Sequence, residues 1–434
     1  MHYGPAILAI CLFLYAISSK RLGLTIFTGP LVFATLGWIL GPGGFGIAGP
    51  VAGERVTDIE LITLLLEGTL VLVLFTDAMG TNVTRWREQT TLPGRLLGVG
   101  LPLTMLAGWG LALLLFSDLS VWEAGLIAII LAPTDAALGQ AVISNPRVPQ
   151  RIRQALNVES GLNDGLALPV FFVVLEAAQA SEASLGAGSL LREILSQVFI
   201  AAAVGVAAGW LAARLIMWTA ERDWMAPAWS KVAMLGVALG AWVFGDGLGG
   251  SGFLAAWIAG VMIGRELRET QPGIGEFTED TSHVLTLLSF FVFGAFVLSD
   301  VIDGITWEVA IYAVLSLTAV RILPVAIAMI GSGLKSQSVL YLGWFGPRGL
   351  ASIILVATIV QESELAGSET ITLVMAATVG LSIYAHGASA WWGSNRYADW
   401  YESQGDEAAE LPESDEVAHV PVSRRFGHID QPPS

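Results

Sequence analysis

Apolar runs long enough to cross a lipid bilayer follow one another along most of this chain. A membrane-spanning helix needs about 20 predominantly apolar residues, and the sequence meets this requirement repeatedly up to residue 392. Charged residues make up only 13% of the 434 positions, whereas soluble domains carry about 25%. This deficit is too large for a surface that faces water. The sequence therefore predicts an all-α integral membrane protein rather than a soluble protein with several buried helices.

About thirteen transmembrane helices are expected from these apolar runs. They cover residues 5–19, 23–42, 59–77, 94–116, 120–144, 152–178, 194–217, 229–246, 250–265, 281–299, 305–331, 336–361 and 369–392. The division between the eighth and the ninth helix rests on a Gly-rich stretch at 245–252. Glycine clusters favour a turn or close helix packing over a continuous helix.

Basic residues predict the orientation of these helices, because Lys and Arg favour cytoplasmic loops. With the N-terminus outside, 17 of the 21 basic residues fall on the cytoplasmic side, and two, Arg55 and Arg192, fall outside. The remaining two, Arg321 and Arg348, lie within apolar runs. An error in the number of helices would scramble this asymmetry. We therefore expect an external N-terminus and a cytoplasmic C-terminus in a multi-pass protein of the cell inner membrane.

From residue 393 onward the chain is polar and acidic. The net charge of the whole chain is -16, and a tail of this kind cannot bury enough apolar surface to fold. Residues 393–434 are therefore predicted to be a mostly disordered cytoplasmic tail. The acidic balance argues against nucleic acid as a partner. The sequence has no G-x-x-x-x-G-K-[ST] phosphate loop, so neither a nucleotide site nor ATP-driven transport is expected.

Six ionisable residues fall inside the predicted membrane spans. They are Glu67, Asp135, Glu159, Asp164, Arg321 and Arg348. A charged group in hydrocarbon is costly, so each of them is a candidate functional residue. Asp77 lies at the predicted end of its helix and is expected to reach water.

The sixth predicted helix carries a cluster of oxygen-bearing side chains. Ser160 and Asp164 are four residues apart and share one helix face, and Glu159 and Asn163 form a second such pair. Carboxylate, amide and hydroxyl oxygens suit a hard cation. The cluster predicts an ion-binding site, although a polar contact between neighbouring helices would also explain it.

Two predicted helices are interrupted in the middle. Pro133 breaks the fifth helix, because proline lacks a backbone donor, and Gly-Trp-Phe-Gly-Pro-Arg-Gly at 343–349 breaks the twelfth. Interrupted helices in corresponding positions of two inverted repeats indicate a transporter's binding site, whereas the alternative is two ordinary proline kinks. Asp135 and Arg348 are expected to compensate each other or the dipoles of the half-helices.

Arg321 needs an acidic partner, since an unpaired arginine in the membrane is expensive. Glu159 is the predicted partner. Such a pair would carry no net charge and would leave Asp164 as the acid that is free to titrate.

Several fragments taken together resemble the NhaP-type members of the monovalent cation/proton antiporter superfamily, relatives of the animal sodium/proton exchangers. The fragments are E-S-G-L-N-D at 159–164, A-P-T-D at 132–135, G-G-S-G-F-L-A-A at 249–256, F-F-V-F-G at 290–294 and G-P-R-G at 346–349, together with Arg321. The resemblance covers about residues 1–392.

The resemblance implies a homodimer in which a six-helix core domain lies beside a dimerisation domain. The core would use the helices near 94–178 and 305–392, and the dimerisation domain those near 5–77 and 194–299. In this family the acid that matches Asp164 binds the cation and the proton in turn. The residues that match Ser160 and Thr134 help to ligate the cation.

The resemblance also bears on charge balance and on a further ligand. An Asn-Asp pair, here Asn163 and Asp164, implies electroneutral exchange, and Glu159 is implied to pair with Arg321. Some relatives place a third-helix glutamate near the ion, so Glu67 is a candidate ligand, with a role at the dimer interface as the alternative.

These observations predict a secondary antiporter rather than an enzyme. Cation and proton would compete for Asp164, with Na⁺ as the first candidate cation and Li⁺ or K⁺ as alternatives, and no cofactor is expected. A cation channel would show a repeated pore loop or a symmetric polar ring. A membrane hydrolase would need a base for its serine, whereas His386 lies far in sequence from Ser160 and is expected to be a packed, hydrogen-bonded histidine.

Overall fold

A computed structural model describes residues 4–22, 25–42, 44–46, 55–80, 91–182, 187–362, 365–405 and 411–415. Every regular element in these ranges is a helix. Eight helical segments among them are both long and apolar enough to cross a membrane, and α2, α7 and most of α18 are shorter apolar helices. The prediction of an all-α membrane protein is thus confirmed.

The first half of the described chain contains nine α-helices and one π-helical turn. They are α1 (Gly4–Leu22), α2 (Gly29–Leu40), α3 (Arg55–Gly80), α5 (Thr91–Arg95), η1 (Leu96–Gly100), α6 (Leu101–Leu115), α7 (Val121–Ile130), α8 (Gln140–Ile143), α9 (Gln150–Glu182) and α10 (Ala187–Ala220).

The second half continues in the same way, with short irregular turns inside some helices. Its elements are α11 (Pro227–Gly247), α12 (Gly252–Leu267), α13 (Glu276–Val292), η2 (Phe293–Leu298), α14 (Ser299–Val301), η3 (Ile302–Gly304), α15 (Trp307–Leu317), α16 (Ala319–Ala328), α17 (Ser336–Trp344), α18 (Leu350–Glu362), α19 (Ser368–Glu402) and η5 (Pro412–Ser414).

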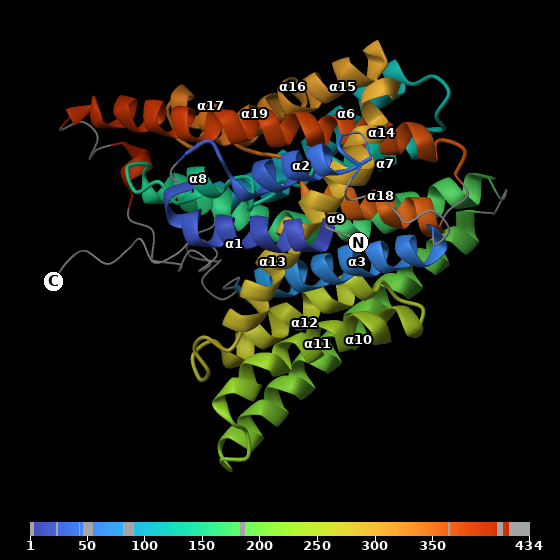
Figure 1. The fold of residues 1–434 in the computed structure, drawn as a ribbon, viewed down its shortest axis with the longest axis vertical. Helices are drawn as coiled ribbons and strands as arrows, with labels where there is room; N and C mark the ends of the chain where they lie inside the picture. Colours follow the sequence, from blue (N-terminus) through green and yellow to red (C-terminus); the bar gives the residue numbers. More distant parts are fainter. Residues whose placement is uncertain are drawn as a thin grey trace.

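The helices form two groups that meet in the middle of the molecule. Figure 1 shows α10, α11 and α12 at one end, and α15, α16, α17 and α19 at the other. Helix α12 packs on α3 and α10, while α9 packs on α3 and α7. The middle layer therefore contains α9, the helix that carries Glu159 through Asp164.

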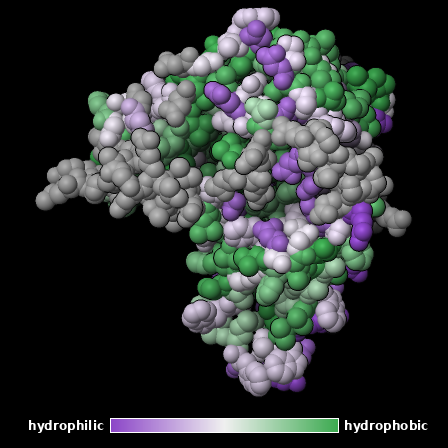
Figure 2. Space-filling view, turned by 90° about the vertical axis from the view of Figure 1, so that its right-hand side faces the viewer, coloured by the Kyte–Doolittle hydropathy of each residue, from purple (hydrophilic) through white to green (hydrophobic). Residues whose placement is uncertain are grey.

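Large apolar side chains stay exposed on the sides of both groups. Leu114 on α6, Phe199 on α10 and Ile330 after α16 are 84%, 73% and 72% exposed. Figure 2 shows extensive hydrophobic areas on both the wide and the narrow part of the molecule. A water-soluble monomer rarely exposes apolar surface on this scale, whereas lipid tails would cover it.

Three predicted helices are divided in the structure. Helix α7 ends at Ile130 and α8 begins at Gln140, while α17 ends at Trp344 and α18 begins at Leu350, so both expected interruptions are present. The run expected at 305–331 is also divided, at Thr318. The Thr318 hydroxyl donates to the Val314 carbonyl, and a side-chain bond of this kind competes with the helical backbone ladder.

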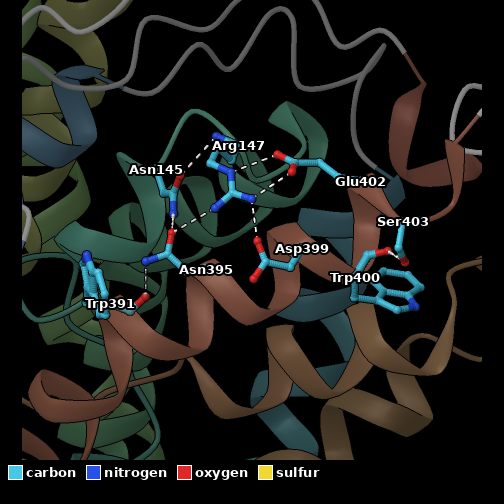
Figure 3. A network of polar contacts seen from close by, with 8 residues as sticks. All are labelled: Asn145, Arg147, Trp391, Asn395, Asp399, Trp400, Glu402 and Ser403. Carbon is cyan, nitrogen blue, oxygen red and sulfur yellow. Dashed lines mark hydrogen bonds and ion pairs between the residues drawn. The ribbon is translucent and has the colours of Figure 1, made fainter.

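The last long helix continues through Glu402 instead of ending near residue 392. Figure 3 shows the contacts of this extension with the turn before α9: Arg147 donates to Asp399 at 2.5 Å and to both carboxylate oxygens of Glu402. Hydrogen bonds to Glu402 and then Asp399 raise the pKa of the Arg147 guanidinium above its usual value. Arg147 therefore stays charged at every physiological pH.

Residues 411–415 also lie against the helices, whereas 406–410 and 416–434 are outside the described residues. Glu413 is 1% exposed and accepts hydrogen bonds from Lys335 N at 2.8 Å and Ser338 Oγ at 2.6 Å. Arg151 on α9 donates to Asp415 and to the Pro412 carbonyl. This short part of the predicted tail is thus packed against the starts of α9 and α17.

Candidate cation site at two interrupted helices

The two interruptions contact each other through Asp135. Its backbone N–H donates to the Pro347 carbonyl at 2.8 Å. Its carboxylate accepts from Leu350 N at 2.8 Å and from Ala137 N at 2.7 Å. Asp135 therefore satisfies a free N–H at the start of α18, where the helix dipole favours negative charge. A Cβ at Gly349 would collide with this carboxylate, so the contact requires glycine there.

Arg348 binds carbonyl groups at the end of α7, as Asp135 binds an N–H group at the start of α18. The guanidinium is fully buried and donates through Nη1 to the Ala132 and Pro133 carbonyls at 2.6 and 3.0 Å. Ser352 Oγ donates to a further carbonyl, that of Ile130, at 2.7 Å. These carbonyls have no helical partner because the chain leaves the helix at this point. A buried positive charge thus lies at the negative end of α7.

A histidine holds the second interruption from α19. His386 is 1% exposed; its Nε2 lies 2.9 Å from the Trp344 carbonyl and its Nδ1 lies 3.1 Å from Ser382 Oγ. Ser382 Oγ accepts from Arg348 N at 2.7 Å. All three bonds form at once if neutral His386 donates through Nε2 and accepts at Nδ1, a tautomer assigned from this network.

Glu159 and Arg321 form a buried ion pair in the centre of the protein. Two parallel bonds, of 2.6 and 2.8 Å, join the guanidinium to the two carboxylate oxygens. Both side chains are 1% exposed. Two-pronged pairs of this kind are the strong form of an ion pair, and the pair has no net charge.

Thr134, Ser160 and Asn163 meet where α9 passes the first interruption. The Thr134 and Ser160 hydroxyls are 3.1 Å apart, and Asn163 Nδ2 donates to Thr134 Oγ1 at 2.7 Å. Asn163 Oδ1 is buried and accepts no hydrogen bond from the residues that the structure describes. A buried oxygen without a donor is rare in native proteins and is suited to a cation.

A cavity of about 290 Å³ opens onto this cluster. Thr134, Asp135, Ser160 and Asp164 line it, and Asp164 is half-buried. Hydroxyl and carboxylate oxygens from two elements therefore face one cavity, and they are the kind of ligands that a hard cation takes. Glu67 is half-buried on α3 but is not among the residues that line the cavity.

An acid and a histidine that line the cavity were not among the predicted site residues. Asp77 on α3 and His283 on α13 both line it, and a Cβ added at Gly161 would be 4.0 Å from Asp77 Cβ. Asp77 was expected at the end of a helix, in contact with water. Helix α3 continues to Gly80, and the apolar Met79 beyond Asp77 was the signal for that longer helix.

Comparison with known proteins gives a consistent result. The family described as "Sodium/hydrogen exchanger, transmembrane" matches residues 7–390. The K(+)/H(+) antiporter NhaP of Alkalimonas amylolytica is 27% identical over 340 residues, which cover 78% of this chain and 56% of that protein. The Na(+)/H(+) antiporter NhaS2 of Synechocystis is 25% identical over 354 residues, covering 76% and 61%.

A solved structure shares the fold. The sodium proton antiporter MjNhaP1 from Methanocaldococcus jannaschii superposes with a TM-score of 0.72 and 20% identity, over 88% of this chain and 98% of that one. The chain spans 56% to 65% of the length of the first curated relatives that it matches.

Proposed function

The chain belongs to the sodium/hydrogen exchanger family, and from this premise we propose that it exchanges a monovalent cation for protons across a membrane. The observation that carries the proposal is that the acids near the interrupted helices have different contacts. Glu159 is bound to Arg321 and Asp135 holds the start of α18, while Asp164 lines a cavity with the oxygens of Thr134 and Ser160.

In the proposed mechanism, cation and proton compete for Asp164. A bound cation favours the ionised carboxylate, and a bound proton removes the charge that holds the cation. Either form of the site is neutral, whereas the empty ionised carboxylate is expensive to move through a low-dielectric interior. Exchange then follows from one rule: the site changes sides only when it is occupied.

We propose Na⁺ as the first candidate substrate, with K⁺ and Li⁺ as alternatives. Relatives are named for both ions: NhaP of Alkalimonas amylolytica for K⁺ and NhaS2 of Synechocystis for Na⁺. Dye-monitored proton movement in everted vesicles, with each chloride salt added in turn at several pH values, decides among the three cations.

The proposed architecture is that of thirteen transmembrane helices with the N-terminus outside and the C-terminus inside. The contacts between Asp135 and Pro347 and between Arg348 and Ala132 support two inverted repeats whose interrupted helices cross. In this proposal the core uses helices near 94–178 and 305–392. Those near 5–77 and 194–299 form the dimerisation domain of a homodimer in the inner membrane.

We propose Asp77, in place of Glu67, as the third-helix carboxylate that attracts the ion. Asp77 lines the same cavity as Asp164. It lies beside Gly161, which directly follows Ser160 and is less than one helical turn from Asp164.

The test of the proposed function is Asp164→Asn in proteoliposomes with an internal pH dye. The amide cannot alternate between a charged and a protonated form, so cation-driven proton movement is expected to fall to the level of protein-free vesicles. Trp210→Ala, on the exposed side of α10, is the matched control and should keep exchange. Retained exchange in Asp164→Asn would exclude Asp164 as the shared site.

A further inference from the structure

Trp257 of α12 lies directly against Gly165 of α9, the residue that follows Asp164. A Cβ built at Gly165 would collide with the indole ring at Nε1, Cε2 and Cδ1. The indole therefore fills a notch that exists only because residue 165 is glycine. Trp257 Nε1 is buried and has no hydrogen-bond partner among the described residues, although a buried indole N–H usually finds one.

Helix α12 is fixed in its own group of helices by contacts between backbones. A Cβ at Gly260 would collide with the Phe75 carbonyl of α3, and one at Gly264 with the Met79 carbonyl of the same helix. On the other side, a Cβ at Gly205 of α10 would collide with the Ala255 carbonyl. The backbones of α3, α10 and α12 therefore pack closely against one another at these three glycines.

Two glycine contacts that α12 and α2 make with the helices of the proposed core are of a different kind. Trp257 lies on Gly165 of α9, and Leu31 of α2 lies on Gly387 of α19, in each case through the side chain. Side-chain contacts of this kind can separate without breaking the backbone packing on either side. Of the two, the Trp257 contact adjoins the acid of the proposed site.

The order of contacts along α9 places the indole beside the acid that lines the cavity. Gly161 lies beside Asp77, which lines the cavity. Gly165 is about one helical turn further along and, like Trp257, is not among the lining residues. The indole therefore packs on α9 directly beyond Asp164, next to the cavity rather than in its lining.

We propose that Trp257 is a conformational latch, a positioning residue that holds α9 with the Asp164 cavity open by seating its indole in the Gly165 notch. The proposal rests on the proposed function, because a latch presupposes that α9 moves relative to α12 during exchange. A contact made in one conformation stabilises that conformation over the others. Removing the indole or filling the notch then lowers the population with the open cavity.

The experiment measures that population without measuring transport. Ala137 lines the cavity, so Ala137→Cys in a Cys11→Ser background reports opening through its labelling rate with a membrane-impermeant maleimide in lipid nanodiscs. We expect Trp257→Ala and Gly165→Ala each to lower this rate by at least about threefold. Trp257→Phe, which keeps a smaller ring in the notch, should give an intermediate rate.

The double variant tests whether the two residues act through one contact. If they do, Gly165→Ala adds little to Trp257→Ala, because the contact is already lost. Trp210→Ala, at a tryptophan that is 47% exposed, should leave the labelling rate unchanged. If Trp257→Ala does not fold, as judged by its gel-filtration profile, Trp257→Phe and Gly165→Ala carry the test.

Two results would overturn the latch: labelling rates equal to the parent in both single variants, or fully additive effects in the double variant. Failure of the proposed function is distinguishable from both. A protein that shows the labelling response but exchanges no ions keeps the latch and loses the antiport proposal. One that exchanges ions but shows no labelling response keeps the antiport and loses the latch.

Discussion

At the scale of single residues, the buried acids differ in what they contact. Glu159 has a cationic partner with which it forms two hydrogen bonds, and Asp135 accepts from backbone N–H groups. Asp164 lines the cavity beside the oxygens of Thr134 and Ser160, and Asp135 lines it too. Glu159 and Asp135 hold parts of the structure together, whereas Asp164 is the acid that we propose for the ion. Stability and transport should therefore respond to different substitutions.

Glu159→Gln is expected to destabilise the fold, because it leaves the Arg321 charge buried without its counter-ion. Breaking a buried pair in this way costs about 3–5 kcal/mol. The thermal unfolding midpoint of the purified protein should fall clearly, while Asp164→Asn, at a half-buried position, should leave it close to that of the parent. Equal midpoints for Glu159→Gln and the parent would contradict a structural role for the pair.

Asp77→Asn should weaken the apparent affinity for the cation, since it removes a negative charge from the wall of the cavity. We expect the cation concentration for half-maximal exchange to rise by about tenfold, as for the loss of about 1.4 kcal/mol. Glu67→Gln, on the same helix but outside the cavity lining, is the matched control and should change it little. A larger effect of Glu67→Gln would restore the original assignment of Glu67.

At the scale of elements, the sequence predicts a feature well where its cause is local. Pro133 ends α7 because a proline lacks a donor wherever it lies. The partner of Arg321 followed from the cost of an unpaired charge together with the family resemblance. Asp77 was not predicted as a site residue because its place beside Gly161 depends on how α3 packs against α9, which no pattern within α3 shows.

The docked segment at 411–415 was missed for the same reason. Its acidic composition indicates disorder, yet Glu413 accepts from Lys335 N and Ser338 Oγ at the start of α17. Helix α17 has no capping side chain of its own at Lys335. The Glu413 carboxylate, distant in sequence, thus supplies the missing cap. No pattern within α17 or within the tail predicts this contact.

Glu413→Ala is therefore expected to release this segment and to destabilise the start of α17. A hydrogen bond to a charged group contributes about 1.5–3 kcal/mol, so the unfolding midpoint should drop and trypsin should cut at Lys335 faster. Glu402→Ala is the control, because its bond to Arg147 is exposed and exposed ion pairs contribute little. Identical digestion of Glu413→Ala and the parent would show that the segment does not cap α17.

At the scale of the whole molecule, the charges near the proposed site nearly cancel. Glu159 offsets Arg321, while Asp135 and Arg348 stabilise opposite helix ends and together add no net charge. Asn163, beside Asp164, is neutral at every pH. In the proposed mechanism the part that changes sides would therefore carry one titrating acid, and we propose that each turnover exchanges one cation for one proton.

Electroneutral exchange predicts that a membrane potential changes neither the rate nor the final pH gradient. The potential is best imposed on proteoliposomes with a thiocyanate gradient, because potassium diffusion would supply a candidate substrate. A clear response to the potential would mean that a second acid takes part in the exchange. Asp77 is the acid to test in that case, since it shares the cavity with Asp164, and Asp77→Asn should then abolish the response while Glu67→Gln does not.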